Sequence, residues 1–358
     1  MIAATQVARA GTWSPRVAPE VLGTRETATV EARHRCIHLL DRFELESGEV
    51  LRDVRQAYYL DGTLNAARDN LVVVCHALTG SADAAGDWWS DIVGPGRAID
   101  TRRYAVLCAN LLGSCYGTTG PSDPARRPFP RVTTRDMARL TERLVASLHV
   151  SSIALVVGGS LGGMVAMGLA ASVPQLVRRA VILAAPAAHP AAAIGWNHVQ
   201  RRIVSLAGEE GLEIARMVAM LTYRTPAELE RRFARAAHAD GGLAVERYLD
   251  HQGRKLRARF DVHSYLALLD AMDAHDVGRD RGGIEAALAP IADRITGVGI
   301  PGDVLYAATD VRGWTDAVGA RYREIHSIHG HDAFLLEHEQ VAVLLQEALG
   351  PASTRGPV

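Results

Sequence analysis

The sequence predicts an α/β fold built on a mostly parallel, doubly wound sheet. Apolar runs of strand length, such as Leu71–Cys75 and Ile153–Val157, alternate with longer segments of helical spacing. A strand with apolar residues at every position is buried on both faces, as in a parallel sheet that helices cover. The length of 358 residues suits one such domain with an insertion.

The first expected elements are an N-terminal extension and an antiparallel hairpin. Residues 1–34 are rich in Ala, Thr, Val, Pro and Arg without a clear period, and we expect them to be poorly ordered. The segments Cys36–Leu45 and Val50–Tyr59 flank the turn Ser47-Gly48-Glu49, a pattern that is typical of a hairpin.

The core is expected to comprise residues 35–188 and 293–350, followed by a frayed tail over 351–358. A helix over Thr134–His149 leads into the strand that begins at Ile153. The remaining strands of the core are expected at Leu71–Cys75, Tyr104–Ala109, Ala180–Ala184, Ile295–Ile300 and Tyr322–Ile325. The glycine-rich loop Asn110–Pro121 lacks the strand-G-x-G-x-x-G-helix order, which disfavours a dinucleotide site.

Residues 189–292 differ in character from the core and are expected to form a helical lid. Apolar strand runs are absent there, and the spacing predicts helices over Gly195–Leu206, Leu212–Leu221, Pro226–Ala237, Leu243–Leu256 and Asp261–Met272. About a hundred residues of helix inserted after a core strand are typical of a cover over a site. We call this segment the helical insertion.

Ser160 is the candidate nucleophile. It lies in Gly158-Gly-Ser-Leu-Gly162, a G-x-S-x-G motif between an apolar strand and an apolar helix. In that motif the serine sits on a strained turn with its hydroxyl exposed, and the helix N-terminus favours a developing negative charge. The alternative is a glycine-rich turn that only lets a helix pack close to a strand.

A serine nucleophile needs a histidine base and a carboxylate that orients it. In enzymes with this turn the order along the chain is serine, acid, histidine. Asp303 follows the strand Ile295–Ile300, and His331 follows the last strand after a glycine, so these two are the candidate acid and base.

The rival residues lie close to these two in the sequence. Asp310 and Asp316 compete with Asp303, although Asp310 lies where a helix should begin and so suits a helix-start role. His326 and His329 compete with His331, but neither combines the preceding glycine with a following apolar helix start.

Two backbone N–H groups are needed to stabilise a tetrahedral oxyanion. Leu161 follows the nucleophile and is the first candidate donor. Leu78, in the loop His76–Gly80 after an early strand, is the second. His76 stands at a strand end, where we expect a structural role.

Composition narrows the class of protein. The net charge is −1, with 48% hydrophobic and 22% charged residues, so neither a nucleic-acid nor a membrane partner is expected. The four cysteines have no C-x-x-C spacing, Met1–Arg25 has no signal-peptide pattern, and we expect a cytoplasmic protein. Lys255 is the only lysine against 38 arginines, which excludes a Walker lysine. No metal site is expected.

The motifs together resemble the homoserine O-acetyltransferase family of acyltransferases with the α/β-hydrolase fold. The likeness extends from about Cys36 to about Glu347. The matching segments are Asn70–Gly80, Asn110–Pro121, Gly158–Met164, Ile194–Asn197, Ala215–Met217, Leu221–Arg224, Tyr248–Gly253, Arg259–Asp261, Ala271–Asp273 and Gly330–Phe334.

This resemblance implies transfer of an acetyl group from acetyl-CoA, as co-substrate, to L-homoserine in methionine biosynthesis. The reaction would be ping-pong, through an acyl-Ser160 intermediate and without a permanently bound cofactor. The resemblance further implies that Arg216 and Tyr223 bind substrate, with Arg216 on the amino-acid carboxylate, and that Asp332 binds its ammonium group. Without the resemblance, a solvated helix face and core packing would explain Arg216 and Tyr223.

The resemblance also leaves alternatives open. Relatives that use succinyl-CoA, or that accept serine or a secondary-metabolite alcohol, fit the same motifs. A serine esterase would need only the nucleophile, acid and base. The resemblance implies a homodimer formed through the helical insertion.

Overall fold

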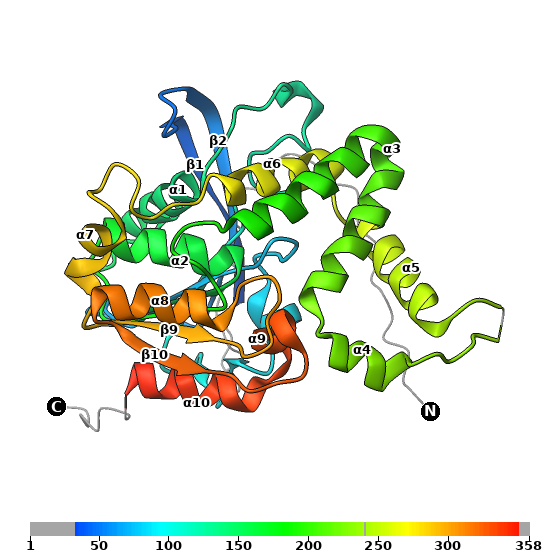
Figure 1. The fold of residues 1–358 in the computed structure, drawn as a ribbon. Helices are drawn as coiled ribbons and strands as arrows, with labels where there is room; N and C mark the ends of the chain where they lie inside the picture. Colours follow the sequence, from blue (N-terminus) through cyan, green and yellow to red (C-terminus); the bar gives the residue numbers. More distant parts are fainter. Residues whose placement is uncertain (1–32, 240, 351–358) are drawn as a thin grey trace, which may run out of the picture. The chain divides into compact units, whose positions relative to one another are not determined.

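The computed structural model describes residues 33–239 and 241–350 (Figure 1). Within them, eight strands form one sheet in the order β1-β2-β6-β3-β7-β8-β9-β10. The bounds are β1 Arg33–Glu44, β2 Val50–Asp61, β3 Leu71–Cys75, β6 Ala105–Ala109, β7 Ile153–Gly159, β8 Ala180–Leu183, β9 Ile295–Gly299 and β10 Arg321–Glu324. From β6 to β10 neighbouring strands are parallel, which confirms the predicted doubly wound α/β class.

The predicted hairpin is present as β1 and β2, which pair antiparallel. The ladder continues to Arg33 opposite Asp61, so β1 begins two residues inside the expected extension. The rest of that extension, and the expected C-terminal tail, lie outside the described residues.

Helices cover both faces of the parallel strands. On one face α1 (Thr134–Ser147), α2 (Leu161–Ser172) and α8 (Ala308–Val318) pack against alternate strand residues, such as Val73 and Ile182. On the other face α10 (His338–Leu349) and the segment around Trp89 pack against the intervening residues, such as Val74. Each central strand is therefore buried on both sides, which is why its sequence is apolar throughout.

Short elements connect the main strands. They are η1 (Ala84–Trp88), β4 (Val93–Gly94), β5 (Ile99–Asp100) and η2 (Pro124–Arg126). β4 and β5 pair with each other in a separate two-stranded sheet, in a segment where no strand was predicted.

Between β8 and β9 the chain is helical, as its spacing predicted. The helices are α3 (Ala191–Tyr223), α4 (Pro226–Phe233), α5 (Ala244–Arg257), α6 (Val262–Asp273) and α7 (Ile284–Leu288), followed by η3 (Ala289–Ile291). The first two predicted helices are joined in α3, but Gly208 has φ 59° and ψ −132° and breaks the helical path between them. In Figure 1, α3 to α5 lie to the right of the sheet.

The catalytic candidates lie beyond the carboxyl ends of the parallel strands. Asp303 follows β9, and His331 lies in the turn η4 (Gly330–Asp332), just before α9 (Ala333–Leu336). α3 contacts η4, so the helical insertion reaches the histidine. Ligand sites in open α/β sheets occur at this edge. Among the described helices, none is long and apolar enough to span a membrane.

Candidate active site

Ser160 occupies the sharp turn between β7 and α2. Its backbone has φ 56° and ψ −127°, a strained conformation for a residue with a side chain. The Ser160 N–H donates to Leu183 O at 3.0 Å and ties the turn to β8. A Cβ atom at Gly158 would overlap the carbonyl of Gly162, and one at Gly162 would overlap that of Cys75. The two glycines of the motif are therefore required by the close approach of α2 to the sheet.

His331 and Asp303 form a buried hydrogen-bonded pair. His331 Nδ1 lies 2.7 Å from Asp303 Oδ2, and Asp303 Oδ1 accepts the N–H groups of Leu305 (2.8 Å) and Tyr306 (3.0 Å). Burial lowers the pKa of His331, but the charge of Asp303 and its hydrogen bond outweigh burial, so the pKa lies above its ordinary value. His331 Nε2 has no hydrogen-bond partner among the described residues.

Three aromatic rings surround His331, and one of them, Phe334, also lies beside the serine turn. Phe334 meets the His331 ring edge-on with 5.7 Å between centroids, and a Cβ atom at Gly159 would overlap the Phe334 ring. Tyr306 packs edge-on at 5.2 Å, and Tyr223 lies tilted at 5.6 Å. The sequence prediction included Tyr223 but missed the two other rings.

The rival acids and bases have other positions. Asp310 lies in the first turn of α8, as its helix-start interpretation expected, and Asp316 lies further along that helix. His329 Nδ1 lies 3.0 Å from Glu228 Oε1, and the exposed His326 lies 3.6 Å from Glu324.

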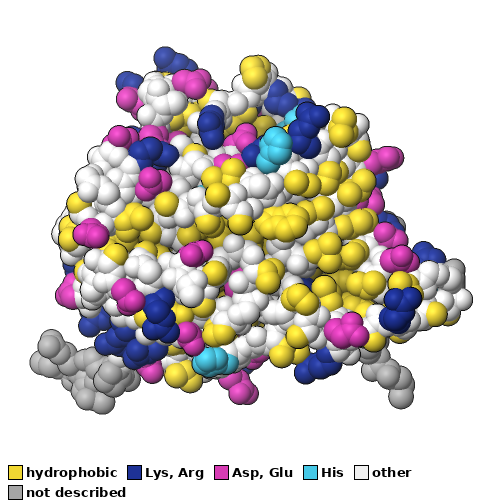
Figure 2. All heavy atoms as spheres, in the orientation of Figure 1, with side chains coloured by type: hydrophobic (Ala, Val, Ile, Leu, Met, Phe, Trp, Pro, Cys, Tyr) yellow, Lys and Arg dark blue, Asp and Glu magenta, His cyan; other side chains and the backbone are white. Residues whose placement is uncertain are grey.

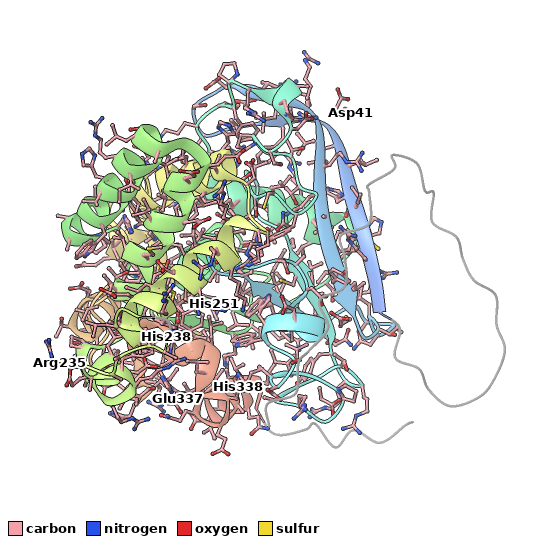
Figure 3. All side chains as sticks on the ribbon, turned by 90° about the vertical axis from the view of Figure 1, so that its right-hand side faces the viewer. Asp41, Arg235, His238, His251, Glu337 and His338 are labelled. Carbon is pink, nitrogen blue, oxygen red and sulfur yellow. The ribbon has the colours of Figure 1, made fainter. Side chains whose placement is uncertain are left out.

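Three more histidines are labelled in Figure 3. His238 and His251 belong to the helical insertion. His338 begins α10, where its Nδ1 lies 3.3 Å from Asp91.

The loop of the candidate oxyanion donor Leu78 is anchored from three sides. His76 is buried, its Nδ1 lies 2.9 Å from Ala77 O, and its Nε2 accepts the Leu111 N–H at 3.2 Å. Burial lowers the pKa of His76 to about 4, so the ring is neutral and structural. The Gly80 N–H closes a turn on Ala77 O at 2.9 Å.

The third anchor comes from the helical insertion. Arg259 donates to Thr79 O and to the Tyr116 hydroxyl, each at 2.7 Å. Leu161, the other candidate donor, is buried at the start of α2, and a Cβ atom at its neighbour Gly162 would overlap the carbonyls of Cys75 and His76. The two candidate donors therefore belong to adjoining segments.

The three candidate substrate residues lie together around His331. The guanidinium carbon of Arg216 is 5.3 Å from the centre of the Tyr223 ring. Burial raises the pKa of Asp332 above its ordinary value, although Arg224, Arg216 and His331 act in the opposite direction. Arg216 comes from α3 and Asp332 from the turn that contains His331, so this cluster joins the insertion to the core.

The sequence prediction missed the ion pair that holds Asp332. Arg224 Nη2 lies 3.1 Å from Asp332 Oδ2, and Arg224 Nη1 donates to Glu228 Oε1 at 3.0 Å. Arg224 follows Tyr223 directly within one of the matching motifs, and that position was the available signal. The pairing itself joins residues more than a hundred positions apart.

A second buried network was also missed. His189 Nε2 lies 2.9 Å from the Tyr306 hydroxyl, and His189 Nδ1 lies 3.2 Å from Asp273 Oδ1. Asp273 also accepts from Asn197 Nδ2 at 2.7 Å. The network links α3 and α6 of the insertion to Tyr306, which packs on His331.

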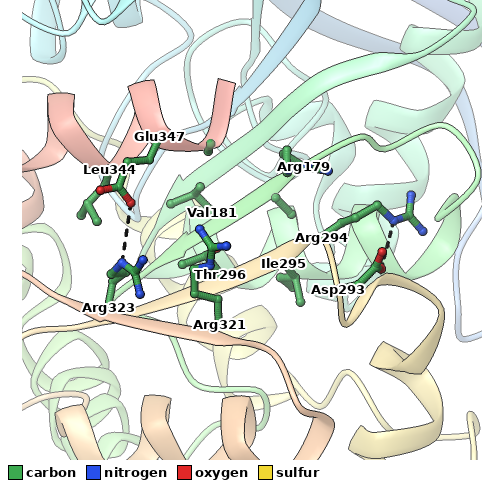
Figure 4. A pocket seen from close by; sticks show the side chains of 12 residues that line it. Arg179, Val181, Asp293, Arg294, Ile295, Thr296, Arg321, Arg323, Leu344 and Glu347 are labelled. Carbon is green, nitrogen blue, oxygen red and sulfur yellow. Dashed lines mark hydrogen bonds and ion pairs between the residues drawn. The ribbon is translucent and has the colours of Figure 1, made fainter. Parts of the chain in front are cut away.

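Two cavities lie at different distances from the candidate site around His331. One of about 80 Å³ lies at the amino ends of β8, β9 and β10, where Arg323 pairs with Glu347 and Arg294 with Asp293 (Figure 4). It is remote from the carboxyl-end cluster. Another of about 590 Å³ is lined by Ala77, Arg216 and Leu335 among others, and so adjoins the candidate site. The described residues contain no cluster of His, Cys, Asp and Glu fit to hold a metal ion.

The fold and the turn at Ser160 define an α/β-hydrolase-fold protein, and the family model described as alpha/beta hydrolase fold matches residues 70–238. A homoserine O-acetyltransferase of Thermus thermophilus is 45% identical over 343 residues, covering 86% of this chain and 89% of the relative. The chain belongs to the homoserine O-acetyltransferase family and is an acyltransferase.

Two solved structures resemble this chain, and the first is a homoserine O-acetyltransferase. A homoserine O-acetyltransferase from Staphylococcus aureus superposes with a TM-score of 0.77 at 33% identity, covering 91% of this chain and 98% of the other. The esterase E22 superposes with a TM-score of 0.80 at 21% identity, covering 89% and 100%. The likeness to the esterase shows the fold alone.

Proposed function

We propose that the protein transfers an acetyl group from acetyl-CoA to the hydroxyl of L-homoserine, in methionine biosynthesis. The observation that carries this proposal is the cluster around His331. The Asp303–His331 pair lies beside a cation, Arg216, and an anion, Asp332. These two charges suit the carboxylate and the ammonium group of an amino acid.

In the first half-reaction Ser160 Oγ attacks the thioester carbonyl. His331 Nε2 takes the hydroxyl proton and then gives it to the departing thiolate sulfur of CoA. The N–H groups of Leu78 and Leu161 stabilise the oxyanion of the tetrahedral intermediate. Asp303 keeps the Nδ1 proton of His331 in place and stabilises the imidazolium form. The product is an acetyl ester on Ser160, with free CoA.

In the second half-reaction the acceptor hydroxyl attacks the ester of Ser160. His331 takes the proton of that hydroxyl and returns it to Ser160 Oγ as the ester bond breaks. Arg216 binds the acceptor carboxylate through two N–H groups, and Asp332 binds its ammonium group. Tyr223 lines the space between Arg216 and His331. The reaction needs acetyl-CoA as co-substrate and no permanently bound cofactor.

Thiol release from acetyl-CoA tests the proposal. Purified protein should release CoA in a homoserine-dependent manner, and Ser160→Ala should abolish this release. Mass spectrometry of the protein incubated with acetyl-CoA alone should detect one acetyl group on Ser160. If thiol release depended on serine instead of homoserine, the proposed acceptor would be wrong. If it required succinyl-CoA, the proposed donor would be wrong.

The esterase alternative gives a different kinetic result. If water is the natural acceptor, hydrolysis of p-nitrophenyl acetate should be rapid and unaffected by homoserine. Under the proposal, homoserine accelerates turnover because it intercepts the acetyl-enzyme.

We further propose that the protein forms a homodimer through the helical insertion. Figure 2 shows hydrophobic side chains gathered over the insertion. The exposed apolar residues on α3 are Ile194, Trp196, Val199, Leu206, Ile214 and Leu221. An apolar patch of this kind indicates an interface. Sedimentation analysis should give a mass near twice that of the chain, and a monomer at micromolar concentration would contradict the proposal.

A further inference from the structure

The cavity of about 590 Å³ beside the candidate site has a mixed polar and aromatic wall. The cavity lies between the loop Ala77–Gly80, η1 and α5. Figure 3 shows the molecule from the side on which the insertion lies. Its volume is within the range of about 300–1,000 Å³ that is usual for small-molecule sites. The lining residues used below are Arg35, Asp83, Asp87, Trp88, Arg216, Lys255 and Arg259.

Four of the lining side chains are cationic, but two of them have other partners. Arg259 is bound to Thr79 O and the Tyr116 hydroxyl, and Arg216 lies over the Tyr223 ring. Arg35, from β1, and Lys255, from α5, are both exposed at the wall of the cavity.

Two carboxylates line the same cavity. Asp83 accepts the Gly86 N–H at 2.9 Å and so caps η1, while Asp87 lies in the first turn of η1. The four cations and two carboxylates leave a net positive charge, which suits an anionic ligand.

Lys255 stands out because it is the only lysine in a chain with 38 arginines. A compact ammonium group with three donors binds phosphate as a point charge, whereas a guanidinium group binds carboxylate or phosphate through two parallel N–H donors. The basic residues next to Lys255 on α5 are either paired with a carboxylate or absent from the cavity wall. Arg257 pairs with Glu213 at 3.0 Å, and Arg254 does not line the cavity.

We propose that Lys255, assisted by Arg35, binds the phosphate groups of the acyl donor, while the thioester end reaches Ser160 beneath the loop Ala77–Gly80. This inference rests on the proposed acyl-CoA donor and assigns the residues that recognise the part of the donor remote from the reaction. Trp88 provides an aromatic wall for the same ligand. The donor phosphates are then held by the insertion and by the first strand of the sheet together.

Calorimetric binding of CoA, dephospho-CoA and pantetheine tests the inference without requiring turnover. Wild-type protein should bind CoA at least tenfold more tightly than pantetheine, which has no phosphate. Lys255→Met should weaken CoA binding about tenfold and leave pantetheine binding unchanged, and Lys255→Arg should retain most of the affinity. Arg254→Met is the matched control, because it removes an exposed charge one residue away without touching the cavity, and CoA binding should not change. Dephospho-CoA lacks the 3′-phosphate but keeps the pyrophosphate, so its affinity shows which of the two groups the site binds.

Two results would overturn the inference: equal affinity of the wild type for CoA and pantetheine, or an unchanged CoA affinity in Lys255→Met. Lys255-dependent CoA binding without acetyl transfer to homoserine would instead defeat the proposed function and leave the phosphate site standing. In the active enzyme, Lys255→Met should raise KM for acetyl-CoA with kcat within twofold, and should leave KM for S-acetylpantetheine unchanged.

Discussion

Replacing Asp303 with Asn should reduce acyl transfer far more than its small change in shape suggests. Asp303 Oδ1 already accepts two backbone N–H groups, from Leu305 and Tyr306. The oxygen of an Asn amide must take that position, because the NH₂ group would face two donors. The NH₂ group then points at His331 Nδ1, which must accept and therefore cannot carry the proton. The remaining ring proton moves to Nε2, the nitrogen that has to accept a proton from Ser160.

The magnitude follows from this tautomer. A wrong tautomer in a serine–histidine–acid site costs about 10⁴ in kcat, which corresponds to about 5.5 kcal/mol in the activation barrier. The assay is single-turnover acetylation of Ser160 by acetyl-CoA, with melting temperature as a check on folding. Asp310→Asn is the matched control and should acylate at the wild-type rate, because Asp310 lies in the first turn of α8. A loss of less than tenfold in Asp303→Asn, or an equal loss in the control, would refute the reasoning.

Three further predictions follow from the same geometry. Because the Asp303 charge raises the pKa of His331 above its usual value near 6.5, and the base must be neutral, kcat/KM should decline on acidification with a midpoint above pH 6.5; a lower midpoint in a pH profile would contradict this. Arg259→Met should slow p-nitrophenyl acetate turnover about tenfold, since the loop of Leu78 loses an anchor; an unchanged rate would exclude this positioning role. Burial lowers the pKa of His76 to about 4 and of His275 to about 3, so the unfolded chain takes up protons first and stability is lost as pH falls below 6.5. In urea unfolding, the free energy of unfolding should fall by about 2 kcal/mol per histidine between pH 7 and pH 5. The fall should be smaller in His275→Gln. Equal stability at both pH values would be inconsistent with this.

The strands of the core could be predicted because burial on both faces leaves a strong signal. Leu71–Cys75 is β3 to the residue, and the prediction that began at Ile153 differs from β7 only in its end. Each position of such a strand contacts a helix or a neighbouring strand, so no polar residue interrupts the run. The longer helices of the insertion, α3 to α6, were predicted from the spacing of their apolar residues.

Other elements left no such signal. β4 and β5 contain two residues each, too few for any period, and they depend on each other for pairing. α3 was predicted as two helices, and the backbone agrees at Gly208, where glycine accepts φ 59° without a steric cost. α7 has only five residues and was not predicted.

The candidate site, too, could be predicted only in part from the sequence. The order of serine, acid and histidine led to Asp303 and His331, and the structure brings these two within 2.7 Å. The pairing of Arg224 with Asp332 could not be predicted, because it joins the residue after α3 to η4 across a long stretch of chain. Such contacts depend on how the insertion packs on the core, which no local pattern records.

The charges around His331 bear on which acceptor the site prefers. Arg224 lies between two carboxylates, Glu228 at 3.0 Å and Asp332 at 3.1 Å, so one negative charge near His331 is not balanced by Arg224. Arg216 supplies the balancing charge, and among the described residues no carboxylate lies within salt-bridge distance of it. A zwitterionic amino acid would pair with Arg216 and Asp332 at once and leave the net charge unchanged. A simple alcohol or water would leave Arg216 without a carboxylate partner, and Asp332 would have only the Arg224 that it shares with Glu228, which is costly in a largely buried site. The arrangement therefore favours an amino-acid acceptor over hydrolysis, and a homoserine analogue without its ammonium group should lose more in kcat/KM than one surface ion pair, about 1 kcal/mol, can explain.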